Sequence, residues 1–209
     1  MRQVRRALWT SQIALSSLLV LCTVMAPNVA ASDGGVSNFG NRALTVAPYT
    51  ASFALSALFV GLAAGQLVKI MPTRWWPPTV LVFLALLDLL VLVSTYPRHL
   101  SVTYSEVHDD LGIALFAYEF VLTIWFAVRS WKVATAIFVT IEVGGSFIGL
   151  LSALKVLHLL YWGQMIGGVG FALLLVTSFP RLVELGRPDS NRTSVGEGGD
   201  RFARRVIDE

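Results

Sequence analysis

The chain has 209 residues, of which 55% are hydrophobic and only 14% are charged, and its formal net charge is +3. This composition is too apolar for an ordinary soluble domain, and the charged residues cluster in short stretches between long apolar runs. The chain is therefore expected to lie in a membrane and to have membrane lipids, not nucleic acid, as its surroundings and partners.

Six apolar segments follow one another along the chain, at residues 8–26, 48–70, 78–96, 110–128, 133–153 and 156–179. Each is close to the ~20 residues that a helix needs to cross a hydrocarbon core about 30 Å thick. Backbone amides in such a core must be hydrogen-bonded within their own segment, so these segments are expected to be helices. The sequence predicts an all-α, polytopic bundle of six transmembrane helices in residues 1–180.

The first segment also has features of a secretory signal. Basic residues precede its apolar run, and Val29-Ala30-Ala31 resembles a cleavage site made of small residues. The run exceeds the ~7–15 apolar residues of a typical signal, which favours a retained helix. Cleavage of residues 1–31 stays open, and it would leave five helices.

Basic residues mark one side of the bundle. Thirteen of the 16 lysines and arginines fall before the first segment, in alternate connections, or after the sixth segment; the other three are Arg42, Arg98 and Lys155. The positive-inside rule then places both termini in the cytoplasm, for a multi-pass protein of the cell membrane. Residues 181–209 are rich in Gly, Ser and Arg, which predicts a disordered, basic cytoplasmic tail.

Three carboxylates lie near the middle of three of these segments. They are Asp88, Glu119 and Glu142, and no lysine or arginine occurs at that depth. A charge at the bilayer centre costs roughly 2.5–3.5 kcal/mol on insertion scales, so intramembrane acids are candidates for function. Gln66 and Gln164 are predicted as amide partners from the second and sixth helices. We expect these five residues to form an intramembrane polar site.

Three interpretations of the acids stay open. A buried, protonated acid can donate a hydrogen bond to a neighbouring helix and act only as structural glue. Alternatively, the acids bind a proton, a cation or a cationic ligand. A third possibility is a basic partner on another protein chain, or on a second copy of this one.

Small residues predict where helices pack closely. The spacing GxxxG occurs at Gly61 and Gly65, at Gly145 and Gly149, and at Gly163 and Gly167. Such spacing lets two backbones approach each other in lipid. The second, fifth and sixth helices are therefore expected to use these faces in a tight bundle. Glu142 shares its helix face with Ser146 and Gly149, so it is expected to point into the bundle.

A second polar cluster precedes the fourth segment, on the predicted outer face. Its members are His99, Glu106, His108, Asp109 and Asp110. Their spacing matches no recognised metal site, so no metal is predicted. Asp109 and Asp110 are expected to cap the start of the fourth helix, and His108 is expected to begin a stripe on one helix face that leads through Gly112 and Leu115 to Glu119.

Cofactor chemistry is not indicated. Cys22 is the only cysteine, which excludes an intramolecular disulfide, a redox pair and a thiolate zinc site. The three histidines lie near the outer surface, where they do not suit a haem between facing helices. Ser146 has no histidine at its depth, so a serine protease is not favoured and an enzyme is the least favoured class.

Two short motifs carry a family resemblance. His108-Asp109-Asp110-Leu111-Gly112, followed by Ala114-Leu115-Phe116, resembles the entry to a middle helix in the Frag/DRAM/Sfk-like superfamily, whose bacterial branch is the domain-of-unknown-function group nine hundred and ninety-eight. Tyr161-Trp162-Gly163-Gln164 is similar to the start of that group's last helix. The resemblance covers mainly residues 48–180, and only His108 and Gly112 carry over from the pattern. It implies a six-helix bundle without established enzymatic chemistry, whose eukaryotic relatives are tied to lipid remodelling.

The sequence therefore favours an integral membrane protein without enzymatic chemistry that binds lipid or a membrane partner. The alternative is a small proton- or cation-coupled transporter that uses Asp88, Glu119 and Glu142. No repeat relates the first three segments to the last three, which disfavours the commonest transporter design.

Overall fold

The computed structural model describes residues 1–30, 35–96, 100–130 and 132–185. Its long helices are α1 (Arg2–Met25), α3 (Val46–Ile70), α4 (Trp76–Thr95), α5 (Val102–Arg129), α6 (Val133–Ala153) and α7 (Leu160–Leu185). Two short helices, α2 (Pro27–Ala30) and the 3-10 helix η1 (Val36–Asn41), connect α1 to α3. All six long helices are long and apolar enough to cross a membrane. The predicted all-α, six-helix fold is confirmed, and the chain is a multi-pass membrane protein.

The start of the fourth transmembrane helix was predicted wrongly. Helix α5 begins at Val102, where the side chain of Ser101 accepts a hydrogen bond from the backbone amide of Tyr104. Asp109 and Asp110 consequently lie within the helix and do not cap it. The apolar run marks only the part of a helix that lies in hydrocarbon, and α5 extends beyond that part.

The end of the last helix also differs from the prediction. Helix α7 continues through Pro180 to Leu185, so the first residues of the predicted tail are helical. Leu182 and Val183 are buried against the core, and this packing favours the helix beyond the proline. Residues 186–209, which hold the rest of the predicted tail, lie outside the described residues.

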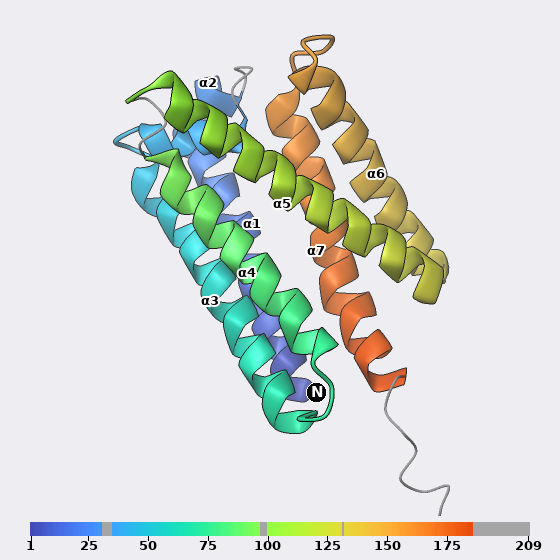
Figure 1. The fold of residues 1–209 in the computed structure, drawn as a ribbon. Coiled ribbons are helices and arrows are strands. Elements are labelled where there is room, and N and C mark those ends of the chain that lie inside the picture. Colours follow the sequence, from blue (N-terminus) through green and yellow to red (C-terminus); the bar gives the residue numbers. More distant parts are fainter. Residues whose placement is uncertain (31–34, 97–99, 131, 186–209) are drawn as a thin grey trace, which may run out of the picture.

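The helices form two groups that are joined by α5 (Figure 1). Helix α3 packs against both α1 and α4, and α6 packs mainly against α7. Helix α5 crosses between the groups and contacts α4, α6 and α7, while α1 also touches α7. The residues of α4 and α6 are therefore linked chiefly through α5.

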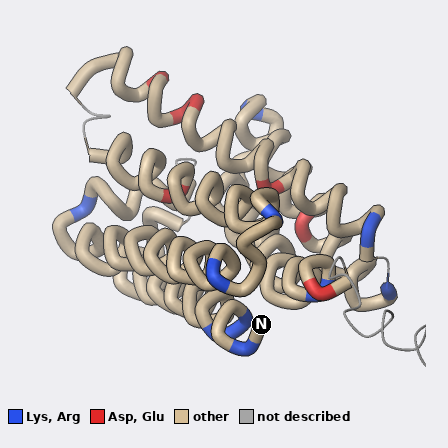
Figure 2. Tube along the Cα trace, turned by 60° about the horizontal axis from the view of Figure 1, so that its bottom comes forward, with Lys and Arg blue, Asp and Glu red and all other residues tan. Residues whose placement is uncertain are grey.

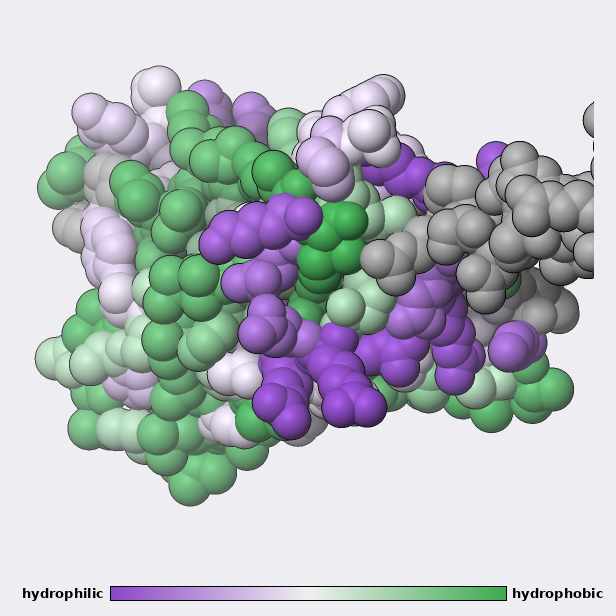
Figure 3. Space-filling view, turned by 90° about the horizontal axis from the view of Figure 1, so that it is seen from below, coloured by the Kyte–Doolittle hydropathy of each residue, from purple (hydrophilic) through white to green (hydrophobic). Residues whose placement is uncertain are grey.

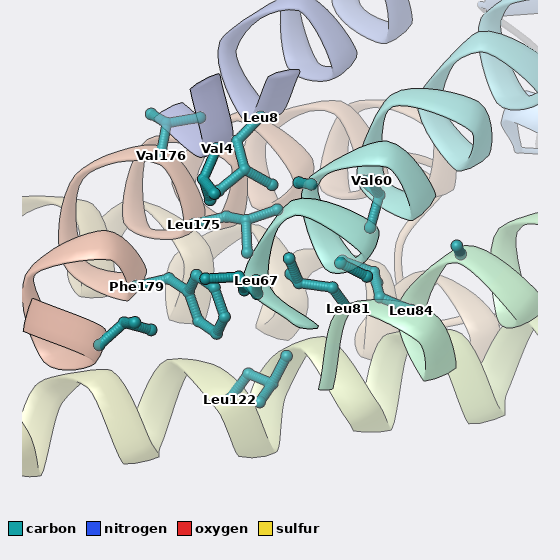
Figure 4. Close-up of a cluster of buried hydrophobic side chains, with 14 of the residues drawn as sticks. Val4, Leu8, Val60, Leu67, Leu81, Leu84, Leu122, Leu175, Val176 and Phe179 are labelled. Atoms are coloured by element: carbon teal, nitrogen blue, oxygen red, sulfur yellow. The ribbon is translucent and has the colours of Figure 1, made fainter. Parts of the chain in front are cut away.

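Two apolar clusters fill the interior at different levels along the helices. The larger one gathers side chains from α1, α3, α4, α5 and α7, including Leu8, Leu81 and Phe179 (Figure 4). The other lies toward η1 and contains Phe39, Tyr49 and Tyr161. On α1, α3, α4 and α5, buried or half-buried polar residues occupy the positions between the two clusters; these residues are Ser11, Gln12, Ser56, Asp88 and Glu119.

The two ends of the described chain lie at the same end of the bundle. The guanidinium of Arg5 on α1 forms an ion pair of 2.9 Å with the carboxylate of Glu184 on α7. Hydrophilic side chains gather at this end (Figure 3), and lysines and arginines stay near helix ends and connections (Figure 2). This arrangement agrees with the predicted clustering of basic residues. The cytoplasmic location of that end stays a prediction.

Candidate functional site

Asp88 ends a chain of hydrogen bonds that crosses three helices. Its carboxylate on α4 is buried and accepts a hydrogen bond of 3.0 Å from the hydroxyl of Ser56 on α3. The hydroxyls of Ser56 and Ser11 are 3.2 Å apart, and the amide of Gln12 donates to Ser11 at 3.2 Å. Because hydrocarbon offers polar groups no other partner, this chain ties α4 to α3 and α1.

Glu142 lies where α6 meets α7. Its side chain is fully buried, and one carboxylate oxygen, Oε1, accepts a hydrogen bond of 3.2 Å from Ser146. The other oxygen, Oε2, is buried and forms no hydrogen bond of good geometry among the described residues, while the backbone amide of Phe171 on α7 also interacts with this carboxylate. A buried polar atom left without a partner is rare and costly, which makes Oε2 a candidate for binding something that the chain itself does not supply.

Glycines hold α6 and α7 in backbone contact beside Glu142. A Cβ added to Gly145 would lie 2.6 Å from the Cα of Gly167, and one added to Gly163 would lie 2.7 Å from the Cα of Gly149. The close-packing prediction is confirmed for these two helices. It is wrong for the second segment, where a Cβ added to Gly61 or Gly65 would meet no atom within 4 Å.

Glu119 connects the two other acids. It is half-buried on α5, and it lies near enough to both Glu142 and Asp88 to interact with them electrostatically. Lysines and arginines of the described residues are confined to the ends of helices and to connections (Figure 2). Glu119 thus stands on the helix that packs against both α4 and α6, and no described lysine or arginine lies at its depth. That the three acids form one site stays a prediction.

The two glutamines do not join this group as predicted. The side-chain oxygen of Gln164 accepts a hydrogen bond of 2.8 Å from the backbone amide of Val36 and so holds η1 against α7. Gln66 is only partly buried on α3. The hydrogen-bond partner of Asp88 is instead Ser56, which bonds to Ser11 and through it to Gln12; none of these three was predicted from the sequence. Each is a polar residue within an apolar segment, and this was the signal that could have identified them.

The predicted outer-face cluster separates into two parts. His108 is buried on α5, and its Nδ1 lies 2.9 Å from the hydroxyl of Ser94 on α4. Glu106, Asp109 and Asp110 are exposed, and His99 lies outside the described residues. In the part of the chain that the structure describes, no group of three or more His, Cys, Asp or Glu residues is placed to hold a metal ion.

The stripe predicted on α5, from His108 through Gly112 and Leu115 to Glu119, has different surroundings at each of its residues. Leu115 lies on it and packs against both apolar clusters. Gly112, the next member of the stripe, faces open space. On α5, Glu119 is therefore separated from His108 by an apolar side chain and by a glycine that faces open space.

Comparison of the chain with models of protein families, with curated proteins and with solved structures gives no match. The resemblance to the Frag/DRAM/Sfk-like superfamily stays a prediction.

Proposed function

We propose that this membrane protein binds a proton or another small cation among Asp88, Glu119 and Glu142 and carries it across the bilayer. The observation that supports the proposal most is the buried, unpartnered Oε2 of Glu142, in a group of acids that has no basic residue. Acids at the membrane centre are costly unless they are neutralised, and a bound cation or proton neutralises them.

The arrangement favours a singly charged species. Calcium takes six to eight oxygen ligands, commonly from several carboxylates around one point. The three acids stand on three helices, and no such group occurs among the described residues. Acids that are spaced from one another suit a proton or a monovalent cation, because the single negative charge of one ionised carboxylate neutralises its single positive charge.

Flux into liposomes tests this proposal. Purified wild type is expected to dissipate an imposed proton or cation gradient, and Glu119→Gln and Glu142→Gln are expected to lower that rate about 100-fold, in the range that loss of a proton-transferring group costs. Both changes keep the size of the side chain and remove the ionisable group. A pH-sensitive dye and a cation-sensitive dye inside the liposomes report the two kinds of flux.

Glu184→Gln is the matched control, because Glu184 is exposed at the end of the bundle. It should transport at the wild-type rate. A well-folded wild type that moves neither protons nor cations would contradict the proposal and leave the acids as interhelical hydrogen-bonding groups.

Binding of a lipid is a second candidate function, supported by the outer surface of α3 and α4. An apolar groove of about 490 Å³ runs between these helices, with Ala57, Gly61, Val82 and Leu86 among its lining residues. It lies within the apolar segments, so the occupant that suits it is the acyl chain of a membrane lipid.

Filling this groove tests the second candidate. Gly61→Leu is expected to remove tightly bound phospholipid from the purified protein, measured by native mass spectrometry, with little change in thermal stability. Gly112→Leu is the control, since a side chain there also meets open space but lies on α5. Equal lipid retention in all three proteins would argue against the groove as a lipid site.

A further inference from the structure

Two buried side-chain oxygens lack a hydrogen-bond partner in the described part of the chain: Oε2 of Glu142 and Oγ1 of Thr123. The missing bond of Thr123 is unusual for this protein. Thr95 and Thr140 donate to the carbonyl four residues earlier in their own helices, at 2.9 Å each. Thr123 does not make this bond, although it is fully buried on α5.

The register of α5 against α6 brings these two residues to the same level. The helices are antiparallel, and a Cβ added to Gly149 on α6 would lie 3.8 Å from the ring of Phe116 on α5. Thr123 follows Phe116 by seven residues, and Glu142 precedes Gly149 by seven residues. Because both helices rise about 1.5 Å per residue, Thr123 and Glu142 lie level with each other.

Glu119 is a second carboxyl group near Thr123 on α5. It precedes Thr123 by four residues, so the two side chains share a face of α5. It also interacts electrostatically with Glu142. The junction of α5 with α6 and α7 therefore holds two carboxyl groups and one hydroxyl, and two of their oxygens have no partner among the described residues.

We propose that Oε2 of Glu142 and Oγ1 of Thr123 are ligands of an alkali metal cation of the size of sodium. This inference rests on the proposed function and specifies its cation. The two oxygens form no direct hydrogen bond, so a proton held by Glu142 would not satisfy the hydroxyl of Thr123, whereas a metal cation between them takes both oxygens as ligands. A single ionised carboxylate balances one monovalent charge, which avoids a net charge in the membrane.

Carbodiimide labelling measures this binding without relying on transport. The reagent attacks protonated carboxyl groups in apolar surroundings, so a cation that displaces the proton protects the acid. The full-length protein in detergent micelles is labelled at fixed pH and ionic strength, with sodium, potassium or a large organic cation, and the labelled residue is identified by mass spectrometry. We expect sodium to slow the labelling of Glu142 in the wild type.

Substitutions at Thr123 determine whether its hydroxyl is a ligand. Thr123→Val, which keeps the shape and loses the oxygen, is expected to raise the sodium concentration needed for protection by about tenfold or more. Thr123→Ser keeps the oxygen and is expected to retain protection, so the proposal stays testable if the valine variant fails to fold. Thr140→Val on α6 is the matched control, because the hydroxyl of Thr140 is exposed and already bonded to its own helix.

The other outcomes overturn the inference in distinguishable ways. Labelling of Glu142 that is independent of sodium, together with proton flux that needs the acids, would mean a proton site with water beside Thr123 and would leave the proposed function intact. Equal sodium protection in the wild type and in Thr123→Val would remove Thr123 from the site. Absence of both sodium protection and flux would overturn the inference and the proposed function together.

Discussion

Gly145→Leu is expected to separate α6 from α7 and to destabilise the protein strongly. The Cβ of any larger residue would lie 2.6 Å from the Cα of Gly167 and 2.8 Å from the carbonyl oxygen of Gly163, both of which are backbone atoms that no side-chain rotation can move aside. Overpacking in a well-packed interior typically costs about 1–3 kcal/mol, and a clash with backbone belongs at the upper end of that range or above it. Unfolding in detergent, followed by tryptophan fluorescence, measures the loss.

Gly144→Leu is a closely matched control for this change. It alters the neighbouring residue on the same helix in the same way, but a Cβ there meets no atom within 4 Å. Its stability is expected to stay near that of the wild type. If both variants unfold at the same detergent concentration, the contact between α6 and α7 is not the one described.

Asp88→Ala is expected to lower the stability by about 2 kcal/mol, because it leaves the hydroxyl of Ser56 without its acceptor and opens a small cavity. The carboxylate accepts the hydrogen bond of Ser56 at 3.0 Å, in a chain that continues to α1. Asp88→Asn keeps an acceptor oxygen in the same place and should cost much less. Thermal unfolding in detergent compares the three proteins.

A double-mutant cycle with Ser56→Ala isolates this hydrogen bond. Polar bonds between helices in membranes are worth about 0.6–2 kcal/mol, so a coupling of that size is expected between the two sites. Strictly additive effects of Asp88→Ala and Ser56→Ala would show that the contact does not contribute to stability. The flux of the Asp88→Asn variant then shows, separately, whether the ionisable group has a further role.

The six helices followed from the sequence because the membrane imposes a strong, local requirement. Length and hydropathy alone identify a segment that can satisfy its own backbone in hydrocarbon, and the fifth predicted segment, 133–153, has the bounds of α6. The depth of the three acids also followed from counting residues along each segment. Which neighbour each acid faces did not follow, because equal depth does not fix the rotation of a helix about its own axis.

Which helix faces meet depended on the tertiary structure. The GxxxG spacing occurs on α3 as well as on α6 and α7, but only the glycines of α6 and α7 lie against another backbone. Similarly, Gln164 bonds to Val36 and not to an acid, because η1 folds over the end of α7. A local pattern such as GxxxG shows that a helix face can pack closely against another helix. The packing of all the helices together determines which helix that face contacts.

The sequence by itself determined that this is a six-helix membrane protein with acids at its centre, because both properties depend on composition along single segments. Only the tertiary structure decided that Ser56 binds Asp88, that Leu115 packs against both apolar clusters, and that Glu142 and Thr123 keep unpartnered oxygens in the described bundle. These features arise between segments far apart in the chain, where rotation and tilt of each helix about its own axis decide which side chains meet.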